Sequence, residues 1–75
     1  MLTLLRHIID SGQVPSQFRI APATFGTEVE LRWKRYHNSA TDYIRVFYNP
    51  PSEEVEKCRD MLAAFGWQSV VVHAT

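Results

Sequence analysis

The clearest structural pattern of this chain lies in residues 27–74, TEVELRWKRYHNSATDYIRVFYNPPSEEVEKCRDMLAAFGWQSVVVHA. Apolar residues first alternate with polar ones, then recur at helical spacing, and finally form a continuous run of valines. Alternation is typical of half-buried strands, helical spacing of an amphipathic helix, and a short apolar run of a strand covered on both faces. The stretch therefore predicts a strand hairpin, a helix and a last strand.

The predicted hairpin spans residues 27–49, and its strands are joined by the loop 37–40. In the first strand three apolar residues alternate with charged ones, and we expect these three to face the core: Val29, Leu31 and Trp33. In the return strand, 41–49, the β-branched residues Ile44 and Val46 are the better match for that side. This choice leaves Tyr43 and Phe47 facing outward.

A helix is predicted after Pro50-Pro51, with Ser52 as its N-cap and Glu53 and Glu54 in its first turn. Gly66 ends the helix. Its apolar stripe is Val55, Cys58, Met61, Leu62 and Phe65. The run 68–73 after this helix predicts an internal strand. A right-handed crossover would set this strand parallel to 41–49, either beside it or one strand away.

The amino-terminal part predicts a short helix with Thr3 as its N-cap and Gly12 at C′, because apolar residues recur at helical spacing between them. Two prolines and a glycine interrupt the next segment, residues 13–26. Residues 17–20 within it therefore have room for at most one short edge strand.

Together these elements predict a small single α+β domain over residues 1–75, in the order α-β-β-β-α-β. Two helices should cover one face of a mainly antiparallel sheet of three or four strands. The predicted core is Leu5, Ile8, Ile9, Val29, Leu31, Trp33, Ile44, Val46, Val55, Cys58, Leu62, Phe65 and either Val70 or Val71.

Composition limits the classes of function. The chain has 75 residues, a formal net charge of +0 and a single cysteine. A chain of this length buries only about 60% of its unfolded surface, so a partner is the expected supplement to its core. No stretch is long enough to span a bilayer, and one cysteine gives no disulfide within the chain, which together predict a cytoplasmic protein.

The residues that carry chemistry are scattered. His7, His37 and His73 have no spacing that favours metal ligation, and Cys58 lies on the apolar stripe of the second helix. No nucleophile, phosphate-loop or metalloprotease motif is present. We therefore expect no enzyme activity, no metal, no cofactor and no small-molecule ligand.

The best candidate site is the outer face of the hairpin, because aromatic and basic side chains are expected to gather there. Its predicted residues are Arg32, Lys34, Tyr36, Tyr43, Arg45 and Phe47. Such residues are enriched at protein interfaces, which predicts a homodimer or a small adaptor or inhibitor that docks on a larger protein. The alternative is single-stranded nucleic-acid binding, with rings stacked on bases and cations on phosphates.

Overall fold

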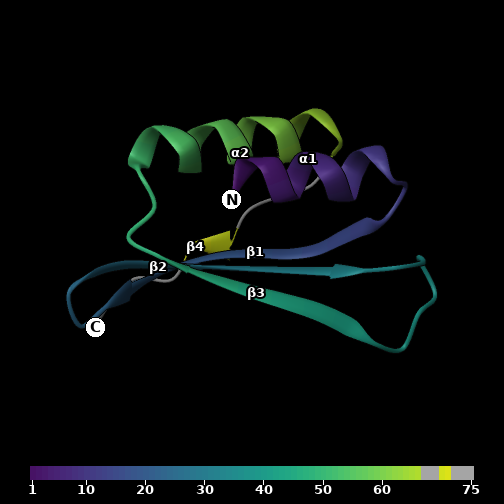
Figure 1. Cartoon of the computed structure of the whole chain (residues 1–75), viewed down its shortest axis with the longest axis horizontal. Helices are drawn as coiled ribbons and strands as arrows, with labels where there is room; N and C mark the ends of the chain where they lie inside the picture. Colours follow the sequence, from purple (N-terminus) through teal and green to yellow (C-terminus); the bar gives the residue numbers. More distant parts are fainter. Residues whose placement is uncertain (67–69, 72–75) are drawn as a thin grey trace.

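In a computed structural model, two helices lie on one face of a sheet, and we call the opposite face the outer face (Figure 1). The structure describes residues 1–66 and 70–71. The elements are α1 (Leu2–Asp10), β1 (Val14–Ala23), β2 (Gly26–Lys34), β3 (Asp42–Tyr48), α2 (Ser52–Ala64) and the two-residue β4 (Val70–Val71). The α+β class and the order α-β-β-β-α are as predicted.

The helix ends follow local rules. Gly12 takes φ +79° after α1, and the N–H groups of Gly12 and Gln13 donate to the carbonyls of Ile9 and Ile8. This is the Schellman arrangement, which favours glycine at that position. Helix α1 starts at Leu2 and not at Thr3, and α2 starts at Ser52 with Pro51 before it, so neither predicted cap is made.

Strand β1 is the largest difference from the prediction. It has ten residues and lies between β2 and β4, whereas the sequence predicted at most a short edge strand over 17–20. The prolines are accommodated at special positions. The pairing with β2 shifts register between Pro15 and Gln17, and Pro22 lies beyond Arg19 and Ile20, the residues that pair with β4. A proline inside a sheet is tolerated at such a bulge or strand end.

The sheet has the order β3-β2-β1-β4, with antiparallel pairing of β1 with β2 and of β2 with β3. Val70–Val71 pair parallel to β1 and therefore run in the direction of β3, as predicted. Their predicted position was wrong: they lie at the end of the order, with two strands between them and β3. The remainder of the predicted strand 68–73 lies outside the described residues.

The core fills the space between the helices and the sheet. Its buried side chains are Leu5, Ile8, Phe18, Val29, Leu31, Cys58 and Leu62. Phe18 was not predicted, because β1 was not. Three predicted members, Ile9, Trp33 and Val55, are half-buried and pack against this core. Phe65 was predicted to be buried but is exposed, because α2 ends at Ala64 and Phe65 is its C-cap.

The return strand β3 is turned over relative to the prediction. In the pairing with β2, Val29 faces Phe47 and Trp33 faces Tyr43. Residues directly opposite in an antiparallel pair lie on the same face of the sheet, so Phe47 belongs to the helix side. Ile44 and Val46 consequently lie on the outer face, and their predicted place in the core was wrong.

Candidate functional site

The structure divides the six predicted binding residues among three places. Arg32 and Lys34 lie on the outer face, whereas the register places three others on the helix side: Tyr43, Arg45 and Phe47. Tyr36 lies in the loop 35–41 between β2 and β3, where it is exposed. The prediction that these residues share one face was therefore wrong.

The rings on the helix side of the hairpin contact other parts of the chain. Trp33 and Tyr43 stack with their ring centroids 5.7 Å apart and their planes 24° from parallel. Phe47 packs against the core, and the Arg45 Cζ lies 5.7 Å from the centroid of the Phe47 ring. These contacts are cross-strand and cation–π pairs that stabilise a hairpin.

The charges on the outer face are balanced. Arg32 forms an ion pair with Glu30, and Arg19 lies opposite Glu30 on the neighbouring strand. Lys34 lies opposite Asp42. Since each of these cations has an acidic neighbour, this part of the outer face carries no strong positive field.

The outer face also carries an apolar row along β3 that the sequence did not predict as a site. We call Ile44, Val46 and Tyr48 the edge stripe. Ile44 is 52% exposed and Tyr48 is 72% exposed, and Val46 between them is half-buried. Exposed apolar side chains that are contiguous, unlike scattered ones, are typical of interaction sites.

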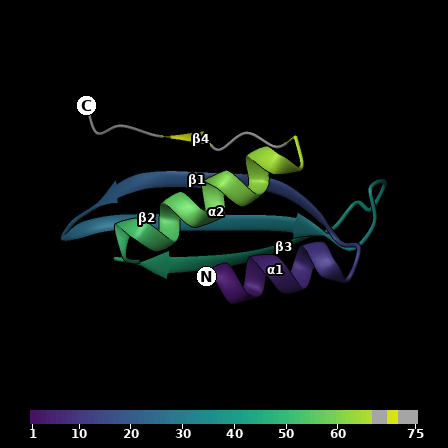
Figure 2. The same cartoon turned by 90° about the horizontal axis from the view of Figure 1, so that it is seen from above.

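Among residues 1–66 and 70–71, the edge stripe lies on a strand with a free edge. Figure 2 shows β3 at the border of the sheet, where β2 is its one neighbour in the order β3-β2-β1-β4. The pairing with β2 continues from Asp42 to Tyr48 without a register shift. Strand β3 contains neither proline nor lysine. Natural edge strands usually carry a proline, a bulge or several charges, because unprotected edges pair with other chains. The charged residues of β3 are Asp42 at its first position and Arg45 on the helix side.

The direction of the β3 backbone groups follows from one hydrogen bond at its end. The Asn49 N–H donates to the Thr27 carbonyl at 2.7 Å, so residues 27 and 49 form a hydrogen-bonded pair. Such pairs alternate along an antiparallel ladder. Residues 43, 45 and 47 therefore bond to β2, whereas Ile44, Val46 and Tyr48 direct their N–H and C=O groups to the free edge.

Asn49 fixes the end of this edge. Its Oδ1 accepts from the Thr27 N–H at 2.8 Å, and its Nδ2 donates to the Phe25 carbonyl at 3.0 Å. Asn49 has φ +50°, a left-handed conformation that asparagine tolerates better than most residues. A Cβ added to Gly26 would overlap the Asn49 Oδ1. We call these bonds and Gly26 the Asn49 junction.

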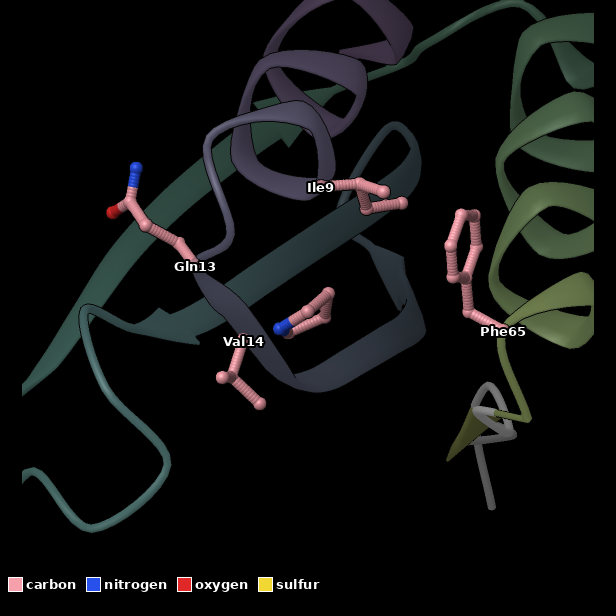
Figure 3. A pocket seen from close by; sticks show the side chains of 5 residues that line it. Ile9, Gln13, Val14 and Phe65 are labelled. Carbon is pink, nitrogen blue, oxygen red and sulfur yellow. The ribbon is translucent and has the colours of Figure 1, made fainter.

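A shallow pocket lies near the carboxyl end of each helix (Figure 3). Ile9 and Phe65 point toward each other across it, and Gln13, Val14 and Pro15 complete its lining. Its volume is about 170 Å³, below the range of about 300–1,000 Å³ that is typical of ligand sites. The pocket offers a small-molecule ligand little enclosure.

The titratable groups do not converge on a reactive centre within the described residues. No cluster of three or more His, Cys, Asp or Glu side chains suited to a metal ion occurs there. Burial raises the pKa of the Cys58 thiol to about 11, so this thiol is protonated at neutral pH and is a poor nucleophile. The pKa of Glu54 is lowered, first by the Leu2 N–H and then by the terminal amine of Met1.

Two further findings bear on function. None of the helices in the described part of the chain has the length and apolar character needed to cross a bilayer. Comparison of the chain with protein-family models, with curated proteins and with solved structures finds no match.

Proposed function

We propose that this protein is a protein-interaction module that binds its partner by adding a strand to the free edge of β3. Strand addition obtains affinity from main-chain hydrogen bonds and specificity from the side chains on alternate positions. The observation that carries the proposal is the coincidence of two features on β3. The residues that direct backbone groups outward are also the residues of the edge stripe.

A protein partner suits this surface better than single-stranded nucleic acid. Nucleic-acid binding by a sheet needs rings and cations on one face, so that bases stack while phosphates are neutralised. Here Tyr48 is the one ring of β3 on the outer face, and the rings of Tyr43 and Phe47 lie on the helix side. The outer-face cations Arg32 and Lys34 lie beside acidic residues. Strand addition requires no cluster of cations.

The experiment that tests the proposal removes one outward N–H from the edge. Val46→Pro deletes this donor, and proline is tolerated on edge strands where the N–H faces solvent. Val46→Thr is the matched control, because it keeps the N–H and the β-branched shape. Each variant and the wild type would be used as bait for interacting proteins, including a differently tagged copy of the chain itself.

Binding of each captured protein would then be measured with purified components, and protection of the β3 amides would be followed by hydrogen exchange. We expect a partner that binds the wild type and Val46→Thr, fails to bind Val46→Pro, and protects the amides of Ile44 and Val46. Partners that bind all three proteins equally, or that leave these amides unprotected, would overturn the proposal.

A further inference from the structure

We infer that the partner is a second copy of this chain, paired antiparallel through β3 with Val46 at the two-fold axis. This inference rests on the proposed function and adds the identity of the partner and the register. The dimer would join the two sheets into one continuous sheet. A two-fold interface uses the same residues on both copies, so β3 must be complementary to itself.

The ladder limits the registers that β3 can use. The outward groups belong to the even-numbered residues, so hydrogen-bonded pairs between copies must join even-numbered residues. If at least five residues of β3 (Asp42–Tyr48) are to be paired, the axis can pass through residue 44, 45 or 46. With the axis at Arg45, the two Arg45 side chains would face each other in the closely spaced type of pair, and like charges directly opposite are destabilising.

With the axis at Ile44, the edge stripe would be only partly covered. Val46 would face Asp42 of the second copy, and Tyr48 would extend beyond the paired region. This register sets an apolar side chain against a carboxylate and leaves the largest ring of the stripe exposed. The register with its axis at Ile44 therefore buries less apolar area on the outer face than the register with its axis at Val46, and such burial drives association.

With the axis at Val46, every residue of the edge stripe has an apolar neighbour. Val46 meets Val46, and Ile44 meets Tyr48 of the second copy. On the helix side, Arg45 lies opposite Phe47 of the second copy, so the two arginines are separated. Within one chain the Arg45 Cζ already lies 5.7 Å from the Phe47 ring centroid, and the dimer would present a second ring to this cation.

The charge and size of the chain also suit self-pairing. Two copies with a formal net charge of +0 do not repel each other over long distances. Ile44 and Tyr48 are each more than half exposed, and burial in a dimer would remove their apolar surface from water. A second copy thus supplies both the missing ladder partner and the apolar cover.

Engineered cysteines test the register. Residues directly opposite have Cβ atoms about 4.5–5.5 Å apart, close enough for a disulfide after small adjustments. Val46→Cys should cross-link to itself under mild oxidation. Ile44→Cys alone should not, whereas a mixture of Ile44→Cys and Tyr48→Cys should give the mixed dimer. Cys58 is buried and does not compete. Self-cross-linking of Ile44→Cys in place of Val46→Cys would overturn the register.

The solution mass tests the dimer itself. Sedimentation over a concentration series should show a reversible dimer that persists in high salt. Val46→Pro removes both hydrogen bonds at the axis and should weaken the dimer by about tenfold to a hundredfold. Asp42→Pro is the control. It also removes an outward N–H, but it lies outside the paired region and at the first residue of β3, where proline is tolerated.

The outcomes separate this inference from the proposed function. A folded wild-type chain that stays monomeric at every concentration overturns the second copy as partner. In that case the proposed strand addition is also overturned if no other protein loses binding to Val46→Pro. It is supported if another protein binds the wild type and fails to bind Val46→Pro. A dimer that is weakened by Asp42→Pro as strongly as by Val46→Pro overturns the register. If Val46→Pro fails to fold, the cysteine variants still decide between these outcomes.

Discussion

Asn49 illustrates how one residue can join two loops of a small sheet. Its side chain bonds to Phe25 and Thr27 at the β1–β2 turn, while its own backbone terminates β3 in a left-handed conformation. The amide accepts from one backbone group through its oxygen and donates to another through its nitrogen at the same time. The Asn49 junction therefore depends on asparagine for its hydrogen bonds as well as for its backbone.

Replacing Asn49 with glycine should separate these two contributions. Asn49→Gly keeps a residue that tolerates φ +50° but removes both side-chain hydrogen bonds. We expect the free energy of unfolding to fall by about 1–3 kcal/mol, as measured by urea denaturation. Asn38→Gly in the exposed loop is the control and should change it by less than about 0.5 kcal/mol. Equal effects of the two substitutions would show that the junction bonds contribute little.

The two glycines that precede and follow β1 should respond differently to alanine. Gly12 and Gly26 both have positive φ, so Gly→Ala costs about 1–2 kcal/mol of backbone strain at each. Around Gly12 there is open space, whereas a Cβ at Gly26 would overlap the Asn49 Oδ1. Thermal unfolding should therefore show a clearly larger loss of stability for Gly26→Ala than for Gly12→Ala. A similar loss for both would mean that Asn49 moves aside without cost.

At the scale of the elements, the two faces of β3 have different roles in stability. Phe47 packs against the core, whereas Ile44 is exposed on the outer face. Phe47→Ala should lower the free energy of unfolding of the monomer by about 2 kcal/mol or more, and Ile44→Ala by less than about 1 kcal/mol. Denaturation at concentrations where the chain is monomeric would measure both. The opposite order would indicate that β3 is turned over.

The sequence predicted some elements well, for identifiable reasons. Helix α2 and strand β2 have one apolar face each, so their periodicity is unambiguous. Strand β3 has apolar residues on both faces, and the loop 35–41 is too long to set the register, so a shift of one residue exchanges the faces. Strand β1 was largely missed because its two prolines are typical of loops.

The candidate site was only partly predictable for the same reason. The sequence predicts a binding surface on the hairpin, and self-association through that surface is one of the functions it predicts. The aromatic residues chosen for the outer face, Tyr43 and Phe47, instead lie on the helix side. The edge stripe is missing from the predicted site because the sequence predicts its β-branched residues, Ile44 and Val46, for the core. The apolar residues on both faces of β3 could have indicated the stripe, because helices on one side of a sheet cover only one of these faces.

At the scale of the whole molecule, Glu54 of α2 links this helix to Met1 and Leu2 at the start of α1. Its Oε1 lies 3.1 Å from the Met1 amine and accepts from the Leu2 N–H at 2.9 Å. These bonds hold α1 beside α2 in the layer that covers the sheet (Figure 2). They also lower the pKa of Glu54 in the folded state below its ordinary value of 4.5.

The stability of the chain should therefore depend on pH through Glu54. A carboxylate with a lowered folded-state pKa stabilises the protein above its unfolded pKa, near 4.5, and this contribution disappears as the pH falls through the folded-state value. The urea midpoint of the wild type should exceed that of Glu54→Gln at pH 7, and the difference should shrink by pH 3. Glu53→Gln, whose carboxylate is exposed and pairs with Lys57, is the control. A constant difference would contradict the linkage.

The Asn49 junction also makes the two ends of the β-sheet unequal for protein engineering. At the junction end, the turn before Gly26 is held by bonds to another strand, and an insertion there would disrupt them. At the opposite end, the hydrogen bonds of the loop 35–41 are local, from Ser39 to Tyr36 and between Ser39 and Thr41. That loop is accordingly the place to graft an epitope or reporter.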